Sequence, residues 1–524
     1  MRAGVPASIR KLSRATGIPK SSVDRHCKAL QKQAESAAGT LWEQEVGQDA
    51  LHRLVLAVVF VFGIKAGVGA DRLSEFFHRV HLDRHIGCSA TTLRRLRGEL
   101  ETLIVSYARE QEAQCQSRAE GIEICAGVDE TFFEQVILVM MDLESGYLVL
   151  EDTAEDRRYA TWYERAQPAL ARLGLTVRYL VSARAQALVK LALEGFSCPS
   201  VPDVFHCLRD LTKVVGGCFH LKLARVEEKQ VQAQHRLETL QAKGKATAVE
   251  QRLLAHLSNE AAMLHTDQTR SQTLLRQATT TLHPFTLAES RRQSAARVET
   301  VLGQTVAELN QLRRRYTQRD NTQAVAKFSR QIPALASVID LWWQGVEHSL
   351  TAVPLDTETQ YWLVARVLPA YYWQQQVAKT KTPVLKAAYQ QAFDQATDAL
   401  AHHPLSTTLA PGILERWQHW ACEWAGKFQR ASSAVEGRNG YLSQLNHCAR
   451  GTSTQRLPVM TVIHNVDLKR ADGTTAAERL FGSAPPDLLD WVVARMGPLP
   501  MPRKARPRAK PKPLSLQTCP ALRG

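Results

Sequence analysis

The sequence predicts a multidomain protein that combines an α/β sheet domain with a large all-helical region. Its 524 residues exceed the ~250–300 at which a single hydrophobic core stops growing. From about residue 121 the apolar residues follow the spacing of strands, whereas over residues 207–430 strand signals nearly vanish and helical spacing takes over. Apolar residues make up 44% and charged residues 22%, which excludes wholesale disorder, collagen-like repeats and a polytopic membrane protein.

Two short helices joined by a tight turn are predicted near the N-terminus. Apolar residues repeat at helical spacing from Ile9, and Thr16-Gly17-Ile18-Pro19 supplies a turn before a second periodic run over residues 21–30. Such a second helix fits the major groove of DNA. We expect five of its side chains to contact DNA: Lys20, Ser21, Ser22, Arg25 and Lys28. The alternative is a helical hairpin with a solvated basic face, and residues 70–104 repeat the pattern.

The longest apolar run, Leu54 to Ile64, predicts a buried helix. It spans eleven residues and falls short of the ~20 that cross a bilayer, so no membrane partner is expected. The ten cysteines show no paired framework, which favours a reducing cytoplasm. The cluster His206, Cys207, Cys218 and His220 matches no usual zinc spacing, so core packing is favoured and metal binding there is left open.

A mixed sheet is predicted for the part of the chain after residue 121. The order strand, strand, strand, helix, strand, helix, strand predicts a sheet covered by helices, with the fourth strand beside the first. The turn acids Asp142 and Glu144 are expected to be solvated. The predicted strands cover residues 122–133, 135–141, 147–150, 177–182 and 201–205, and the helices cover 159–173 and 185–193.

The helical region divides by composition. Residues 226–320 lack tryptophan and are rich in Gln, Glu and Arg, which predicts a long helical pair, whereas seven of the ten tryptophans lie between Trp342 and Trp424 and predict an aromatic-rich lobe. The Pro-rich tail carries six basic residues within 503–512; it predicts a disordered cationic segment that lies along phosphate or keeps the protein soluble. The expected domains are residues 1–110, 120–222, 223–427, 428–482 and 483–524.

One acid stands out in the predicted sheet. Asp129 lies in the apolar strand Gly127 to Phe133, and a buried carboxylate usually needs a partner or a metal ion. The best-placed second acid would follow the strand 177–182, where the sequence has Ala183. By context the best third acid is Glu436, although Ser433 and Glu436 also form the Ser-x-x-Glu pattern of a helix capping box. Thr475 to Glu478 repeats that pattern, and there we interpret it as capping alone.

Several blocks together resemble a DDE transposase of a bacterial insertion sequence. The blocks are Asp129 in its strand, Val181 to Leu188, Pro202 to His206, Val435 to Gly440 and Asp472 to Arg479. The resemblance implies a ribonuclease-H-like core interrupted by a large helical insertion, an N-terminal helix-turn-helix region, and DNA cleavage and strand transfer. The partners it implies are terminal inverted repeats, target DNA and further copies of the chain at the bacterial nucleoid. In such cores three acids hold two divalent ions, usually Mg²⁺.

The resemblance assigns site residues one by one. Asp129 matches the first acid and Glu436 the third, whereas the second falls 183 − 129 = 54 positions after the first, on Ala183. Alanine offers no oxygen to a metal, so we expect weak metal binding and little or no cleavage. Asp203, on the next predicted strand, and Glu130, on the opposite face, are poorly placed to substitute.

Two neighbours of Glu436 complete the expected site. Arg438 and Asn439 lie within one helical turn of Glu436 and are predicted to contact phosphate, with a solvated pair as the alternative. Two rival functions stay open. One is a non-enzymatic DNA-binding protein, either a domesticated transposase or a regulator. The other is a structural or interaction protein organised by the helices of residues 226–320.

Overall fold

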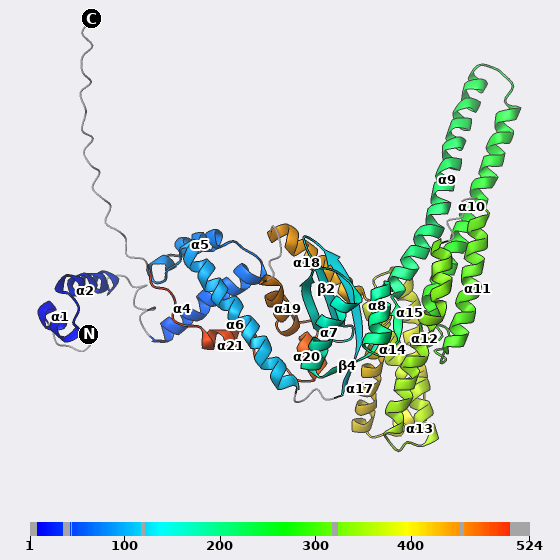
Figure 1. Cartoon of the computed structure of the whole chain (residues 1–524). Helices are drawn as coiled ribbons and strands as arrows, with labels where there is room; N and C mark the ends of the chain where they lie inside the picture. The colour runs from blue at the N-terminus through cyan, green and yellow to red at the C-terminus, as the bar shows by residue number, and fades with distance from the viewer. Residues whose placement is uncertain are drawn as a thin grey trace, which may run out of the picture. The chain divides into compact units, whose positions relative to one another are not determined.

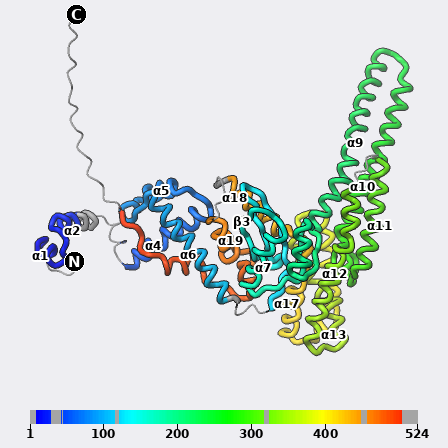
Figure 2. Tube along the Cα trace, in the orientation of Figure 1, coloured from blue at the N-terminus to red at the C-terminus, as the bar shows by residue number. Residues whose placement is uncertain are grey.

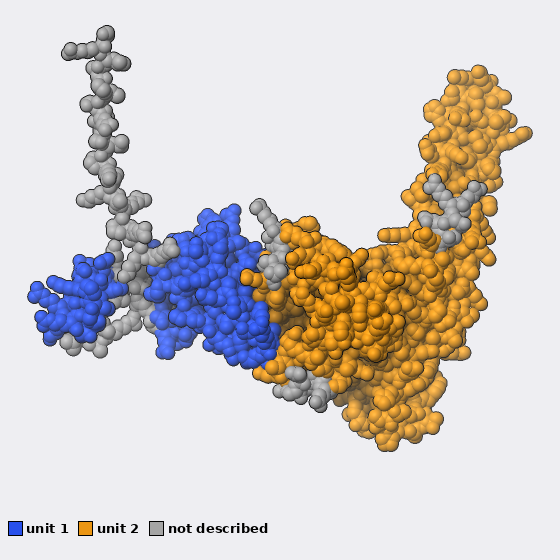
Figure 3. Space-filling view, in the orientation of Figure 1, with its two compact units in different colours: residues 1–110, 486–524 blue, residues 111–485 orange. Residues whose placement is uncertain are grey.

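The computed structural model describes residues 8–34, 42, 45–116, 121–316, 323–449 and 455–502. The chain forms two compact units, which Figure 3 colours separately: residues 1–110 with 486–524, and residues 111–485. The basic tail at 503–512, predicted to be disordered, lies outside the described residues.

The first unit is helical throughout its described part. The N-terminal pair is α1 and α2: Ser8 caps the first helix, and Gly17 ends it with a φ of 67° in the left-handed region, where glycine is not strained. Val23 is the buried residue of this pair. The helices of the unit are α1 (Ile9–Thr16), α2 (Lys20–Ala34), α4 (Glu45–Val58), η1 (Val59–Lys65), α5 (Ala70–Arg79), η2 (Leu82–Arg84), α6 (Ala90–Gln116, which continues past residue 110) and α21 (Leu488–Arg495).

The run predicted as a buried helix belongs to the continuous helical stretch Glu45–Lys65. Val55, Leu56 and Ile64 are buried in the unit, whereas Leu54 and Phe62 are exposed. Among the described residues this is the one helical stretch that is long and apolar enough to cross a membrane by length and composition, and half of its most apolar window is buried. The stretch therefore contributes to the hydrophobic core of the first unit.

The second unit contains one mixed five-stranded sheet, as the sequence predicts. The strand order is β3-β2-β1-β4-β5; β1 pairs antiparallel with β2 and β2 with β3, while β1–β4 and β4–β5 are parallel. The fourth strand thus lies beside the first. The strands are β1 (Ile122–Phe132), β2 (Val136–Asp142), β3 (Leu148–Ala154), β4 (Leu175–Ser182) and β5 (Ser200–Pro202).

Each face of the sheet has its own hydrophobic core. Val128 and Leu138 pack with Trp162 of α7 on one face, whereas Val139 and Val181 belong to the cluster that extends into the helical region on the other. The smaller helices around the sheet are α7 (Tyr159–Leu173), α8 (Gln186–Lys190), η3 (Leu191–Gly195), α18 (Ser433–Ala449), α19 (Arg456–Val466) and α20 (Ala476–Phe481).

The helical region runs between β5 and α18. Figures 1 and 2 show α9 and α10 as a long hairpin, which forms the predicted helical pair. Trp342, Trp343, Trp362 and Trp373 are almost fully buried in the predicted aromatic lobe. The helices are α9 (Val204–Ala242), α10 (Ala248–Thr281), α11 (Ala295–Arg314), α12 (Gln323–Thr351), α13 (Thr357–Trp362), η4 (Leu363–Val367), α14 (Leu368–Lys379), α15 (Pro383–Ala401), α16 (Pro404–Thr408) and α17 (Pro411–Lys427).

Two local predictions were wrong. The predicted strand over 201–205 ends at Pro202, because Asp203 caps the N-terminus of α9. Asp142 is not solvated but 3% exposed, since its carboxylate accepts hydrogen bonds from the backbone amide of Cys125 and from the amide and hydroxyl of Ser145. The first error follows from a local cap between Asp203 and the His206 amide, and the second from bonds of Asp142 to both the nearby Ser145 and the distant Cys125.

Candidate functional site

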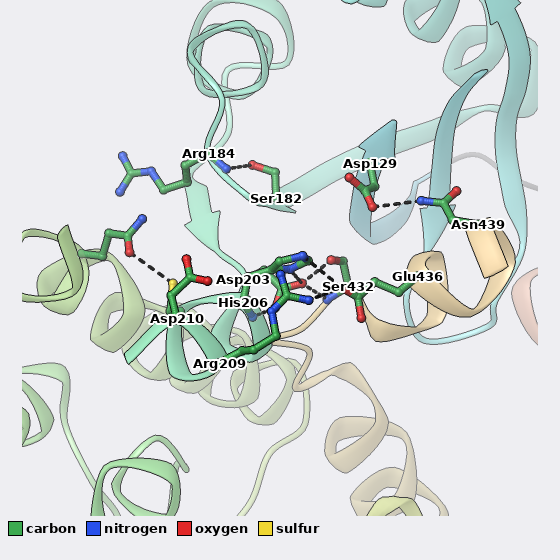
Figure 4. A network of polar contacts seen from close by, with 12 residues as sticks. Asp129, Ser182, Arg184, Asp203, His206, Arg209, Asp210, Ser432, Glu436 and Asn439 are labelled. Carbon is green, nitrogen blue, oxygen red and sulfur yellow. Dashed lines mark hydrogen bonds and ion pairs between the residues drawn. The ribbon is translucent and has the colours of Figure 1, made fainter. Parts of the chain in front are cut away.

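Asp129 lies on β1, opposite Val139 of β2, on the face of the sheet that α18 covers. Its Oδ2 accepts a hydrogen bond from Nδ2 of Asn439 at 2.9 Å, and burial raises the pKa of its carboxyl group. Gly127 permits the close approach of α18, because a Cβ there would lie 2.5 Å from Leu143 and 3.0 Å from Val435. The structure therefore brings Asp129 next to the helix that carries Glu436 (Figure 4).

Ala183 follows the last residue of β4 and has an exposed side chain. The parallel pairing of β1 with β4 ends at Gly127 and Val181; continued for two residues, the same register would set position 183 level with Asp129. The position thus stands where the sequence places the second acid, and an exposed alanine supplies no oxygen there.

Asp203 is fully buried, and its carboxylate accepts three hydrogen bonds. Its carboxylate accepts from the backbone amide of His206 at 3.1 Å, from the backbone amide of Ser432 at 2.8 Å and from the Ser432 hydroxyl. The neighbouring backbone bond from the Val204 amide to the Arg430 carbonyl measures 3.0 Å. Asp203 therefore ties the start of the helical region to its end, and as a metal ligand it would give up these bonds.

Glu436 lies in the first turn of α18 and contacts α9. Its Oε1 is 3.0 Å from Nε2 of His206 and 3.9 Å from Nη1 of Arg209, and burial raises the pKa of its carboxyl group. The backbone amide of Glu436 bonds to the Ser432 carbonyl, while its side chain points to α9. The carboxylate is thus engaged with the first turns of α9.

His206 was interpreted from the sequence as a core histidine at the end of a strand. It lies instead in the first turn of α9, with a side chain 23% exposed, and its Nδ1 is 3.4 Å from Asp203. His206 and Arg209 were missed as neighbours of Glu436. The sequence pattern that could have revealed them is Pro202-Asp203 before an apolar-periodic run, which is typical of a helix N-terminus. On such a helix His206 and Arg209, three residues apart, would lie on the same face.

Arg438 does not reach solvent. Its guanidinium forms two hydrogen bonds of 2.6 Å with the carboxylate of Glu151, to which the Thr461 hydroxyl also donates at 2.7 Å. The side chains of Arg438 and Glu151 are 2% and 0% exposed. A phosphate contact from Arg438 does not fit this arrangement. Asn439 is also turned inward, toward Asp129.

The residues present do not fit a pair of Mg²⁺ ions. Two acids, Asp129 and Glu436, stand where the resemblance calls for three, because position 183 has no oxygen and the Asp203 oxygens are engaged. Over the described residues no group of three or more His, Cys, Asp or Glu side chains is arranged to hold an ion.

The cysteines and histidines of α9 do not converge either. Cys207 contacts Oε1 of Gln331 at 3.2 Å, and Cys218 contacts the carbonyl of Arg313 at 3.9 Å. The two cysteines are 218 − 207 = 11 positions apart on one helix, or about 16 Å at a rise of 1.5 Å per residue. Core packing therefore fits the buried Cys207, whereas Cys218 is half-buried, His206 turns toward Glu436 and His220 is exposed.

The expected DNA-contacting residues lie on α2. Lys20, Ser21, Arg25 and Lys28 are exposed and Ser22 is half-buried. Lys28 forms an ion pair of 3.0 Å with Asp24, one helical turn earlier. Four of the five side chains are therefore available to a partner of this helix pair.

Comparison with known proteins gives one partial match. No curated protein and no solved structure matches the chain. Over residues 363–508 the chain is similar to a family of unknown function (DUF6399), a match that includes Glu436 and the whole of α18.

Proposed function

We propose that this chain is a DNA-binding protein of transposase descent, which binds the terminal repeats of a mobile element and does not cut them. The observation that carries the proposal is position 183. It directly follows the end of β4, the parallel neighbour of the strand that carries Asp129, and is an exposed alanine, while Glu436 lies on the helix that covers Asp129.

The arrangement of the sheet supports descent from a ribonuclease-H-like core. Asp129 lies on the central strand β1, and its parallel neighbour β4 ends at Ser182, one residue before position 183. A long helical region separates this sheet from α18, which returns to cover β1 and carries Glu436. This return of α18 to the central strand supports the proposed descent.

DNA is the partner that the charge favours. The formal net charge is +15, and α2 carries exposed basic side chains. The turn that precedes α2 has the glycine and proline expected in a helix-turn-helix. We propose that α2 contacts the terminal repeats, that copies of the chain associate to hold two ends, and that the protein acts at the nucleoid in the bacterial cytoplasm.

A second candidate is Mg²⁺-dependent cleavage and strand transfer. It is favoured by two acids on neighbouring elements, since Glu436 lies on α18, the helix whose Asn439 bonds to Asp129; burial is the main cause of the raised pKa of Glu436, to which the charge of Asp129 adds. Because Ala183 occupies the position of the second acid, one of the three metal ligands is absent, and we rank this activity below DNA binding without cleavage.

Binding to DNA that carries the ends of the element tests the proposal. The protein should bind these ends in EDTA as tightly as in Mg²⁺, and more tightly than unrelated DNA of equal length. Binding that needs a divalent ion would contradict the proposal. Self-association without affinity for DNA at moderate salt would favour the structural or interaction protein instead.

A further inference from the structure

Two helices beside Glu436 carry glycines that no internal contact explains. Gly437 and Gly440 lie on α18, and Gly216 and Gly217 lie inside α9. A Cβ atom built at any of the four would meet no atom within 4 Å, so the fold does not need these residues to be small. Glycine inside a helix is less stable than alanine. No contact within the described residues accounts for these four glycines.

The glycines of α9 belong to a cationic face. Residues 209, 213, 216 and 220 repeat at three- and four-residue spacing, which places them on one side of the helix. Arg209, Lys213 and His220 are exposed there. From Val204 to Val226, α9 carries one acid, Asp210, which pairs with Lys327 of α12 at 3.6 Å and so points to another side. This face is positive and continuous with the site, because Arg209 is 3.9 Å from Glu436.

The glycines of α18 border the same point. Gly437 directly follows Glu436, and Gly440 lies three residues further, both exposed. Since Glu436 contacts both His206 and Arg209, the exposed side of α18 and the cationic face of α9 meet at this carboxylate.

We propose that these two helix faces form a docking surface for the DNA backbone. The α9 part consists of Arg209, Lys213, Gly216, Gly217 and His220, and the α18 part of Gly437 and Gly440. Arginine and lysine bind phosphate oxygens. Glycines on a helix surface let a sugar-phosphate strand come closer to the helix backbone, because no side chain stands between them. The inference rests on the proposed DNA binding and assigns a second contact, on the sheet-containing unit and separate from α2.

Glycine-to-alanine variants test the surface, because they should keep or raise stability while lowering affinity. We expect Gly216→Ala with Gly217→Ala, and Gly437→Ala with Gly440→Ala, to unfold at or above the wild-type temperature. In EDTA each pair should weaken binding of full-length protein to the element ends by on the order of tenfold. The matched control is Gly303→Ala on α11. Gly303 is exposed and a Cβ there also meets no atom within 4 Å, but the acidic Glu299 lies one helical turn earlier, so no phosphate contact is expected. This variant should bind DNA as the wild type does.

A charge variant tests the same surface independently. Arg209→Gln with Lys213→Gln should lower the slope of log affinity against log salt by about two, since each lost phosphate contact removes about 0.9. Arg236→Gln, on the exposed tip half of α9, should leave the slope unchanged. Normal affinity and slope in stable variants would overturn this inference alone. Failure of the wild-type protein to bind DNA would instead overturn the proposed function.

Discussion

Asp203 and Ser432 are joined by two hydrogen bonds across 229 residues of chain. The bonds tie the first turn of α9 to the residue before α18, so the helical region starts and ends at one point of the sheet domain. The same tie sets Glu436 against His206. Geometry at the candidate site thus depends on a buried carboxylate that the resemblance does not count among the acids.

Removing this carboxylate should destabilise the second unit. Asp203→Ala leaves the Ser432 amide and hydroxyl without an acceptor and uncaps α9, at an expected cost of about 3–4 kcal/mol in the free energy of unfolding. Urea denaturation followed by tryptophan fluorescence measures the change. Asp210→Ala, which removes an exposed ion pair on the same helix, should shift it by less than about 1 kcal/mol. Equal effects of the two variants would contradict the role of Asp203.

The buried pair of Arg438 and Glu151 should behave as a structural unit. Arg438→Met leaves Glu151 as an unpaired buried charge, which costs about 3–5 kcal/mol, whereas adding Glu151→Leu should recover much of the loss. The double-mutant cycle is measured by denaturant unfolding. Arg165→Met, which breaks an exposed pair with Asp152, serves as the control and should cost about 1 kcal/mol or less.

A phosphate contact from Arg438 would give a different pattern. The Arg438→Met, Glu151→Leu double variant, once folded, should bind DNA with the salt dependence of the wild type. A slope lowered by about one would show that this arginine does reach phosphate.

His464 should contribute a loss of stability as the pH drops from 7 to 5, opposed by Glu144, whose pKa burial raises to about 7. Burial lowers the pKa of His464 to about 4, while Nε2 contacts the Gly146 carbonyl at 2.9 Å. Below pH 6.5 the unfolded chain binds a proton at this histidine and the folded chain does not, so the unfolded state gains roughly 1–2 kcal/mol by pH 5. His464→Gln should remove this part of the pH dependence. If the free energy of unfolding of the variant changed with pH as much as that of the wild type, the pH dependence would come from other groups.

Contacts of α2 with DNA predict a further salt effect. Lys20→Gln with Arg25→Gln should weaken binding to the element ends and lower the salt slope by about two. Lys28→Gln should have a smaller effect, because Lys28 pairs with Asp24. Affinity measured by fluorescence anisotropy at several salt concentrations checks both. Unchanged binding in both variants would favour a solvated basic face.

Much of the sheet was predictable because its strands carry their signal locally. The three antiparallel strands are joined by short turns, and the helix Tyr159–Leu173 was predicted with the bounds that it has. The position of β4 beside β1 followed from the order of the elements.

The partners of the site residues were less predictable, because they depend on contacts between segments far apart in sequence. Asp203 was assigned to a strand from the apolar run around it, yet Ser432, 229 residues later, fixes its role. Arg438 was expected at the surface by its proximity to Glu436, but Glu151 on β3 draws it inward. These pairs form because the end of the helical region packs against the sheet. A local sequence pattern does not predict that packing.

Cleavage of DNA carrying the element ends, in the presence of Mg²⁺, tests the central claim most directly. The protein as it stands should leave this DNA uncut while binding it, because Ala183 supplies no ligand beside Asp129. The comparison is Ala183→Asp, which adds a carboxylate at an exposed position and should produce cleavage that EDTA abolishes. Robust cleavage by the unaltered protein would contradict the account.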